Sequence, residues 1–90
     1  MFKYTTSTLN KIEDLLNEAA YVVRYEKGSF KAGYCVLKDK RVVVINKYFN
    51  TEARINCFLD IISTIDMNEI SLSDKSKQLL KHINEFQAAA

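Results

Sequence analysis

One segment constrains the fold of this chain more than any other, namely residues 27–49, which read KGSFKAGYCVLKDKRVVVINKYF. Both glycines of the chain lie in it, and aromatic and β-branched residues, which favour strands, recur along it. Two short polar stretches, Lys27-Gly28-Ser29 and Lys38-Asp39-Lys40, interrupt the apolar runs in the way that turns do. The segment therefore predicts a β-hairpin.

Strand formers extend this prediction to a sheet of three strands, which we place at Tyr21–Glu26, Phe30–Leu37 and Arg41–Lys47. The turn at Lys38-Asp39-Lys40 lacks glycine, which favours a type I turn or a bulged loop over a two-residue turn. We expect the strands to pair in the order of the sequence, as an antiparallel sheet.

The third strand contains four consecutive apolar residues, Val42, Val43, Val44 and Ile45. Such a run is typical of a strand that is covered on both faces. In sequence order, however, this strand lies at an edge of the sheet, and a long apolar edge must be covered or paired. We therefore expect a dimer edge at Val42, Val43, Val44 and Ile45, through which two copies form one continuous sheet.

Helices are predicted on both sides of this region, because apolar residues recur there at three- and four-residue spacing. A cap among Thr5–Thr8 starts the first helix, and Asn50 or Thr51 caps the second. After a linker at 66–70, Ser71 or Ser73 caps the third. The sequence thus predicts an α+β fold with a helix, a three-stranded antiparallel sheet containing a β-hairpin, and then two helices.

The length of 90 residues fits one small domain, which we place at 1–87. Ala88–Ala90 has no pattern, and we expect a cloning scar or a disordered tail there. A chain this short buries a limited core, so an oligomer that hides more apolar surface is a natural source of stability. This favours a homodimeric or protein-interaction module as the function.

The charge distribution favours a second function, although the formal net charge is only +2. Seven bases and two acids lie between Arg24 and Lys47, interleaved with aromatic residues, as in surfaces on which single-stranded nucleic acid stacks. The lysines also have a structural explanation, because lysines on strands commonly face water and prevent a sheet edge from aggregating. The alternative function is thus nucleic-acid binding through the hairpin region 24–49, with a face made of Arg24, Lys27, Lys31, Tyr34, Lys38, Lys40 and Arg41.

Three polar residues flank the predicted start of the second helix, namely Asn46, Arg54 and Asn56. The two asparagines can satisfy backbone groups at the strand-to-helix junction. With Arg54 they can instead form a polar contact site for a carboxylate or for the backbone of a partner.

Residues that carry enzymatic chemistry are sparse. Cys35, Cys57 and His82 have no spacing known for metal ligands, and two glycines cannot form a phosphate-binding loop. We therefore expect that the protein is not an enzyme and that it binds no cofactor and no metal. If Cys35 were instead a catalytic nucleophile, its thiol would be alkylated rapidly at neutral pH. Two cysteines without a signal peptide or an apolar run long enough to span a membrane predict a cytoplasmic protein with reduced thiols.

Parts of the sequence resemble a family of small uncharacterised bacterial proteins. The resemblance rests on Gly28-x-Phe30-x-x-Gly33-Tyr34-Cys35, on Val42-Val43-Val44-Ile45-Asn46-Lys47 and on Arg54-Ile55-Asn56. The region that holds these segments, residues 28–56, is about a third of the chain. It implies a cytoplasmic bacterial α+β protein and carries no activity with it.

A second likeness is to the amino-terminal half of bacterial metallopeptidase-like domains of the phage-repressor-cleaving type. There, strands lead into a helix that bears His-Glu-x-x-His, whereas the corresponding helix here reads Phe58-Leu59-Asp60-Ile61-Ile62-Ser63. Without those imidazoles zinc is not held and water is not activated, so the likeness implies a shared scaffold alone.

Overall fold

The computed structural model describes residues 3–27, 33–65 and 71–88. The predicted α+β class and the order of elements are confirmed. The elements are α1 (Thr6–Glu18), β1 (Val22–Glu26), β2 (Tyr34–Leu37), β3 (Val42–Asn46), α2 (Thr51–Thr64) and α3 (Asp74–Ala88). The predicted linker at 66–70 lies outside the described residues. Residues 28–32, for which the sequence predicts part of a turn and the start of the second strand, lie outside them as well.

The sheet has the order β1-β3-β2 and is mixed. The hairpin is confirmed, because β2 and β3 are antiparallel neighbours. The expectation of an all-antiparallel sheet is wrong, since β1 pairs with β3 in parallel, from Val22 opposite Val42 to Glu26 opposite Asn46. The third strand of the chain thus inserts between the first two, and it runs in the same direction as β1.

The central position of β3 also overturns the expected dimer edge. Val42, Val43, Val44 and Ile45 pair with β1 on one side and with β2 on the other, so this backbone offers no free edge to a second copy. The edges of the sheet are β1 and β2. Burial within a single copy explains two residues of the apolar run, because Val43 and Ile45 are fully buried in the core.

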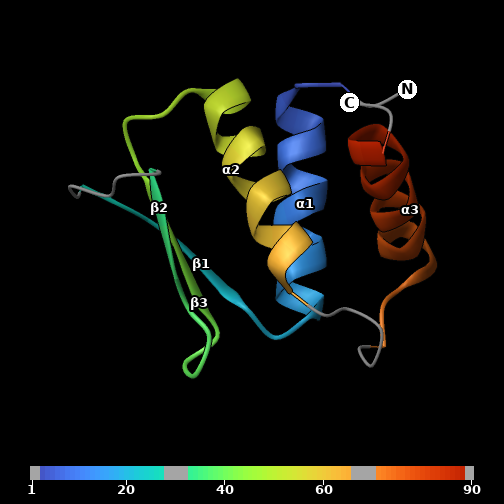
Figure 1. Ribbon diagram of the computed structural model, residues 1–90, viewed down its shortest axis with the longest axis horizontal. Coiled ribbons are helices and arrows are strands. Elements are labelled where there is room, and N and C mark those ends of the chain that lie inside the picture. The colour runs from blue at the N-terminus through green and yellow to red at the C-terminus, as the bar shows by residue number, and fades with distance from the viewer. Residues whose placement is uncertain (1–2, 28–32, 66–70, 89–90) are drawn as a thin grey trace.

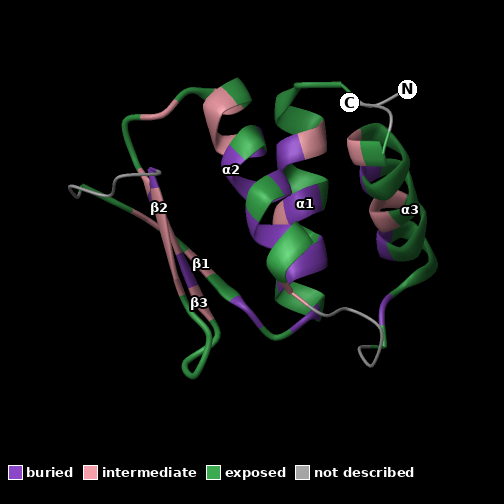
Figure 2. Cartoon of the chain, viewed as in Figure 1, coloured by how far each residue is buried: buried purple, intermediate pink, exposed green. Residues whose placement is uncertain are grey.

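All helices of the described chain lie on one side of the sheet, as Figure 1 shows. α1 and α2 form the layer next to the sheet, and α3 packs against α1. Figure 2 shows the buried residues on the sides of α1 and α2 that meet. The core is made of side chains from these helices and from the sheet face that they cover, including Leu9, Ile12, Leu15, Leu16, Val43, Ile45, Ile55, Phe58, Ile61 and Ile62.

Side-chain caps begin the helices where the sequence predicts them. The Thr8 backbone N–H donates to Thr5 Oγ1 at the start of α1, and the Ala53 N–H donates to Asn50 Oδ1 at the start of α2. Before α3, the Ser76 N–H donates to Ser73 Oγ. At the other end of the chain, α3 includes Ala88, the first residue of the predicted tail.

The carboxyl end of α1 closes in a Schellman motif without glycine. The Ala20 N–H donates to the Asn17 carbonyl, and the Tyr21 N–H donates to the Leu16 carbonyl. Ala20 takes the left-handed conformation that this motif requires, with φ 65°. Glycine adopts this conformation without steric cost, so the fold with an alanine here is less stable than it would be with a glycine.

Candidate interaction surface

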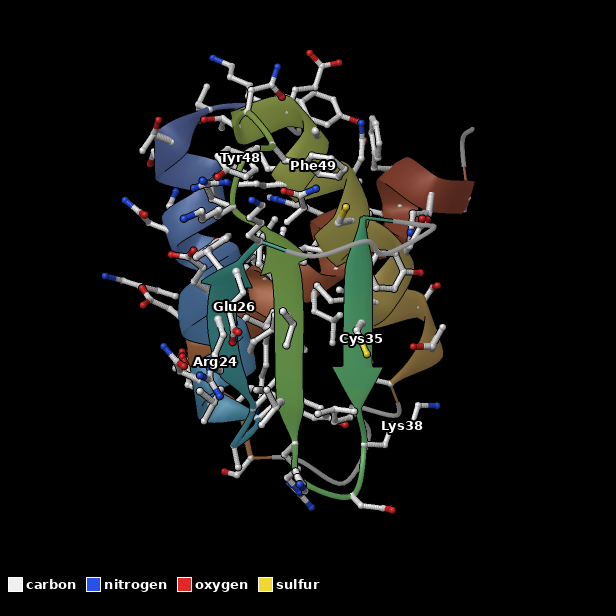
Figure 3. All side chains as sticks on the ribbon, turned by 90° about the vertical axis from the view of Figure 1, so that its left-hand side faces the viewer. Arg24, Glu26, Cys35, Lys38, Tyr48 and Phe49 are labelled. Carbon is white, nitrogen blue, oxygen red and sulfur yellow. The ribbon has the colours of Figure 1, made fainter. Side chains whose placement is uncertain are left out.

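The sheet has an inner face, which packs on the helices, and an opposite face, called here the outer face. Alternation along the strands and their register determine which residues share it. One row across the outer face is Val22, Val42 and Leu37, and the next is Arg24, Val44 and Cys35, with Glu26 beside Asn46 beyond them. Figure 3 looks directly at this face, with the helices behind the sheet.

The centre of the outer face is apolar. Val22 is 54% exposed and Leu37 is 44% exposed, while Val42, Val44 and Cys35 are half-buried. In a sheet covered on one side, the strands usually alternate between apolar residues toward the core and polar residues toward water. β3 departs from this pattern because valines lie on its outer face as well.

Two opposite charges lie on β1 at the rim of the outer face. Arg24 Nε and Glu26 Oε2 are 2.9 Å apart, and both side chains are largely in water, at 61% and 46% exposure. An exposed pair of this kind adds little stability to a single copy. It does leave the outer face with balanced charge, because the strands contribute one base and one acid to it.

The residues of the predicted nucleic-acid face lie on different parts of the molecule. Arg24 is on the outer face, whereas Tyr34 packs against the core from the inner face. Arg41 Nη1 donates to the Ala19 carbonyl at the end of α1, 3.3 Å away. Lys38 and Lys40 are exposed at the hairpin turn, and Lys27 is exposed after β1; Lys31 lies outside the described residues.

Of the three residues of the predicted polar contact site, Asn46 and Arg54 both bond to the backbone at the junction between β3 and α2, whereas Asn56 lies elsewhere on α2. Asn46 Oδ1 accepts from the Tyr48 N–H, so this side chain shapes the junction between β3 and α2. Arg54 Nη2 donates to the Lys47 carbonyl at 3.0 Å, near that junction. Asn56 is exposed two residues further along α2, which places it on another side of the helix.

A cluster that sequence reasoning missed joins α1, β1 and α2. The Tyr25 hydroxyl donates to Glu13 Oε2, and the Arg54 guanidinium lies over the Tyr25 ring, 4.3 Å from its centroid. Burial raises the pKa of the Tyr25 phenol, and the hydrogen bond and charge of Glu13 raise it further. This phenol therefore stays protonated and acts as a structural donor. Among the described side chains, the buried Arg54 Nε has no hydrogen-bond acceptor.

A polar groove of about 390 Å³ lies between α1 and α3 and includes Lys11, Asp14, Lys75 and His82 in its lining. At one end the Glu18 carboxylate accepts hydrogen bonds from the Ser73 N–H and from the hydroxyls of Ser73 and Ser76. These bonds, led by the one from the Ser73 backbone, lower the pKa of Glu18. A carboxylate of the chain itself thus occupies the amino-terminal end of α3 and anchors that helix to α1.

Cys35, Cys57 and His82 are on three different elements. Cys35 lies on the outer face, Cys57 is buried on α2, and His82 is exposed at the groove. Burial, with a smaller effect of the Asp60 charge, raises the pKa of the Cys57 thiol and makes it a poor nucleophile. In residues 3–27, 33–65 and 71–88, no three His, Cys, Asp or Glu side chains are arranged to hold a metal ion.

Comparison of the chain with models of known families, with curated proteins and with solved structures finds no match. The two resemblances described from the sequence therefore stay predictions. No helix in the described part of the chain has the length and apolar character needed to cross a membrane.

Proposed function

We propose that this protein is a non-enzymatic protein-interaction module that forms a homodimer by packing two outer faces together. The observation that carries the proposal is the distribution of apolar residues on β3. This central strand places Val43 and Ile45 in the core and Val42 and Val44 on the outer face, although the helices cover only the inner face. A second sheet packed on the outer face would give all four residues an apolar environment.

The charge of the outer face favours a second copy over a nucleic acid. Binding to a polyanion requires an excess of basic groups along one surface, whereas Arg24 and Glu26 balance each other on this one. A neutral face with an apolar centre and a charged rim has the composition of a protein interface. A small core also favours assembly, because each copy then buries apolar surface that one domain leaves in water.

Sedimentation velocity over a concentration range from about 1 µM to about 1 mM tests the proposal, since an interface of moderate size dissociates in this range. We expect the wild-type chain to pass from monomer to dimer. Val44→Lys places a charge at the centre of the outer face and is expected to abolish the dimer, while the circular dichroism of the monomer stays unchanged.

The matched control is Tyr48→Lys, which removes a side chain that is 69% exposed and lies outside the sheet. This variant is expected to dimerise as the wild type does. A wild-type chain that stays monomeric at every concentration contradicts the proposal. A dimer that survives Val44→Lys also contradicts it and points to the edge strands β1 and β2 instead.

Nucleic-acid binding through the region 24–49 is the competing function, and the exposed Lys38 and Lys40 at the hairpin turn favour it. Fluorescence anisotropy with single- and double-stranded oligonucleotides at low salt tests this alternative. An electrostatic complex must weaken steeply as salt rises. We expect no saturable binding, and a salt-sensitive complex lost in a Lys38→Glu/Lys40→Glu variant would favour the alternative.

A further inference from the structure

We propose that the two outer faces meet about a two-fold axis that runs parallel to the strands, so that β3 lies over β3 and β1 of each copy lies over β2 of the other. Val22 of each copy then packs on Leu37 of the other. This inference rests on the proposed homodimer and names the contacts that decide its geometry.

The two most exposed apolar side chains of the outer face lie on opposite edges of the sheet. Val22 on β1 is 54% exposed and Leu37 on β2 is 44% exposed, and both are beside Val42 of the central strand. In a two-fold contact, when one position meets a second position of the other copy, the second also meets the first. An axis along β3 exchanges the two edges, so one pair of reciprocal contacts covers Val22 and Leu37 of both copies.

The strand register supports this axis. The outer face has two rows with apolar centres, one through Val42 and the next through Val44. A two-fold axis parallel to the strands leaves each level along β3 facing the same level of the other copy. Both valines therefore meet their own counterparts, which gives the apolar contact that the proposed homodimer requires.

An axis that runs across the strands matches these rows less well, because it reverses β3 and places β1 over β1. With the axis at the level of Val42, Val44 faces the hairpin turn at 38–41 of the other copy. With the axis midway between the two valines, Val22 faces Arg24 of the other copy. With the axis at the level of Val44, the two Arg24 side chains face each other. Of these arrangements, only the axis parallel to the strands matches both apolar rows and covers both edge residues.

The charged residues of β1 are compatible with the axis parallel to the strands. Arg24 then faces Cys35 of the other copy at the rim of the contact; Figure 3 labels these two residues on the two edge strands. The aliphatic part of an arginine side chain can cover an apolar surface while its guanidinium stays in water. The bridge from Arg24 to Glu26 joins two groups of the same copy, so both charges keep a partner in the dimer.

Complementary charges at the two edge positions test the inference, using Val22→Lys and Leu37→Glu as single variants. In either homodimer each introduced charge faces an apolar residue, so we expect the dissociation constant to rise at least about tenfold. In an equimolar mixture, a one-to-one heterodimer joins the introduced lysine to the introduced glutamate and keeps one unaltered contact of Val22 with Leu37. We therefore expect native mass spectrometry to show the heterodimer as the main dimeric species.

Tyr48→Lys is the matched control for the added charge, because Tyr48 is exposed and lies outside the sheet. Mixed with Leu37→Glu, it is expected to form mainly its own homodimer. A mixture of Val22→Lys with Val22→Glu distinguishes the two axes, since position 22 faces position 22 only when β1 lies over β1. An enriched heterodimer in that mixture would overturn the inference.

Absence of the heterodimer from the mixture of Val22→Lys with Leu37→Glu would also overturn the inference. The proposed homodimer would still stand in that case if the wild type dimerised and Val44→Lys abolished association. A wild-type chain that never dimerises would instead remove both proposals together.

Discussion

The ring of Phe49 lies against the α-carbon of Gly33, so that a β-carbon at this glycine would overlap ring atoms Cε2 and Cζ. Gly33 precedes β2 and has φ 81°, while Phe49 follows β3, so the contact joins the two ends of the hairpin beside the start of α2. Phe49 is labelled in Figure 3 at the upper end of the sheet. The glycine is therefore required both by its backbone conformation and by the ring that packs on it.

Gly33→Ala is expected to destabilise the fold by about 2 kcal/mol or more, because the positive φ costs an alanine about 1–2 kcal/mol and the ring must also move. Urea unfolding of the wild type, Gly33→Ala, Phe49→Ala and the double variant measures this. In the Phe49→Ala background, Gly33→Ala should lower the free energy of unfolding only by the part that the positive φ causes. Equal costs in both backgrounds would show that the ring does not contribute.

Ala20→Gly is expected to stabilise the protein by about 0.5–1 kcal/mol, since glycine fits the left-handed position of the Schellman motif without strain. Thermal unfolding measures the gain as a rise in midpoint temperature. Ala19→Gly is the matched control, because Ala19 has φ −79° and gains nothing from glycine. That control is expected to lose stability, and a similar gain in both variants would contradict the assignment.

Glu18→Gln is expected to weaken the attachment of α3 to α1, because an amide oxygen is a weaker acceptor than a carboxylate. Since the folded-state pKa of Glu18 is lowered from 4.5, its stabilising effect is complete above that pH and is lost as pH falls through the folded pKa. Urea unfolding from neutral to acidic pH should therefore show that the free energies of unfolding of the wild type and of Glu18→Gln become equal at low pH. Asp14→Asn, on the preceding turn of α1, is the control at neutral pH and should leave the attachment of α3 unchanged, because the hydrogen bonds to Ser73 and Ser76 come from Glu18.

Tyr25→Phe is expected to cost about 1–2 kcal/mol at neutral pH, because it removes a hydrogen bond to the Glu13 carboxylate. The pKa of Tyr25 is raised above 10.0, so the contribution of the phenol is complete below pH 10.0 and declines as pH rises beyond it. The stability difference between wild type and variant should shrink in that alkaline range. Tyr48→Phe, at an exposed position, should leave stability unchanged at every pH.

Local sequence signals determined the elements of this fold. The caps at Thr5 and Asn50, the spacing of apolar residues in α1 and α2, and the strand formers around a turn at Lys38–Arg41 act between residues close in the chain. Such interactions are visible in the sequence, so the helices and the hairpin were predicted correctly. The apolar run Val42–Ile45 was also recognised as a strand with two apolar faces.

Only the tertiary structure decided where that strand lies. The partners of a strand depend on hydrogen bonds between distant residues, such as the Val22 N–H and the Arg41 carbonyl, and alternation along one strand does not name its neighbours. For the same reason, no local pattern indicated the contact of Tyr25 with Glu13 and Arg54, or the meeting of Glu18 with Ser73 and Ser76. The sequence by itself determined that β3 is apolar on both sides. Packing determined that one side is the core and the other is the outer face.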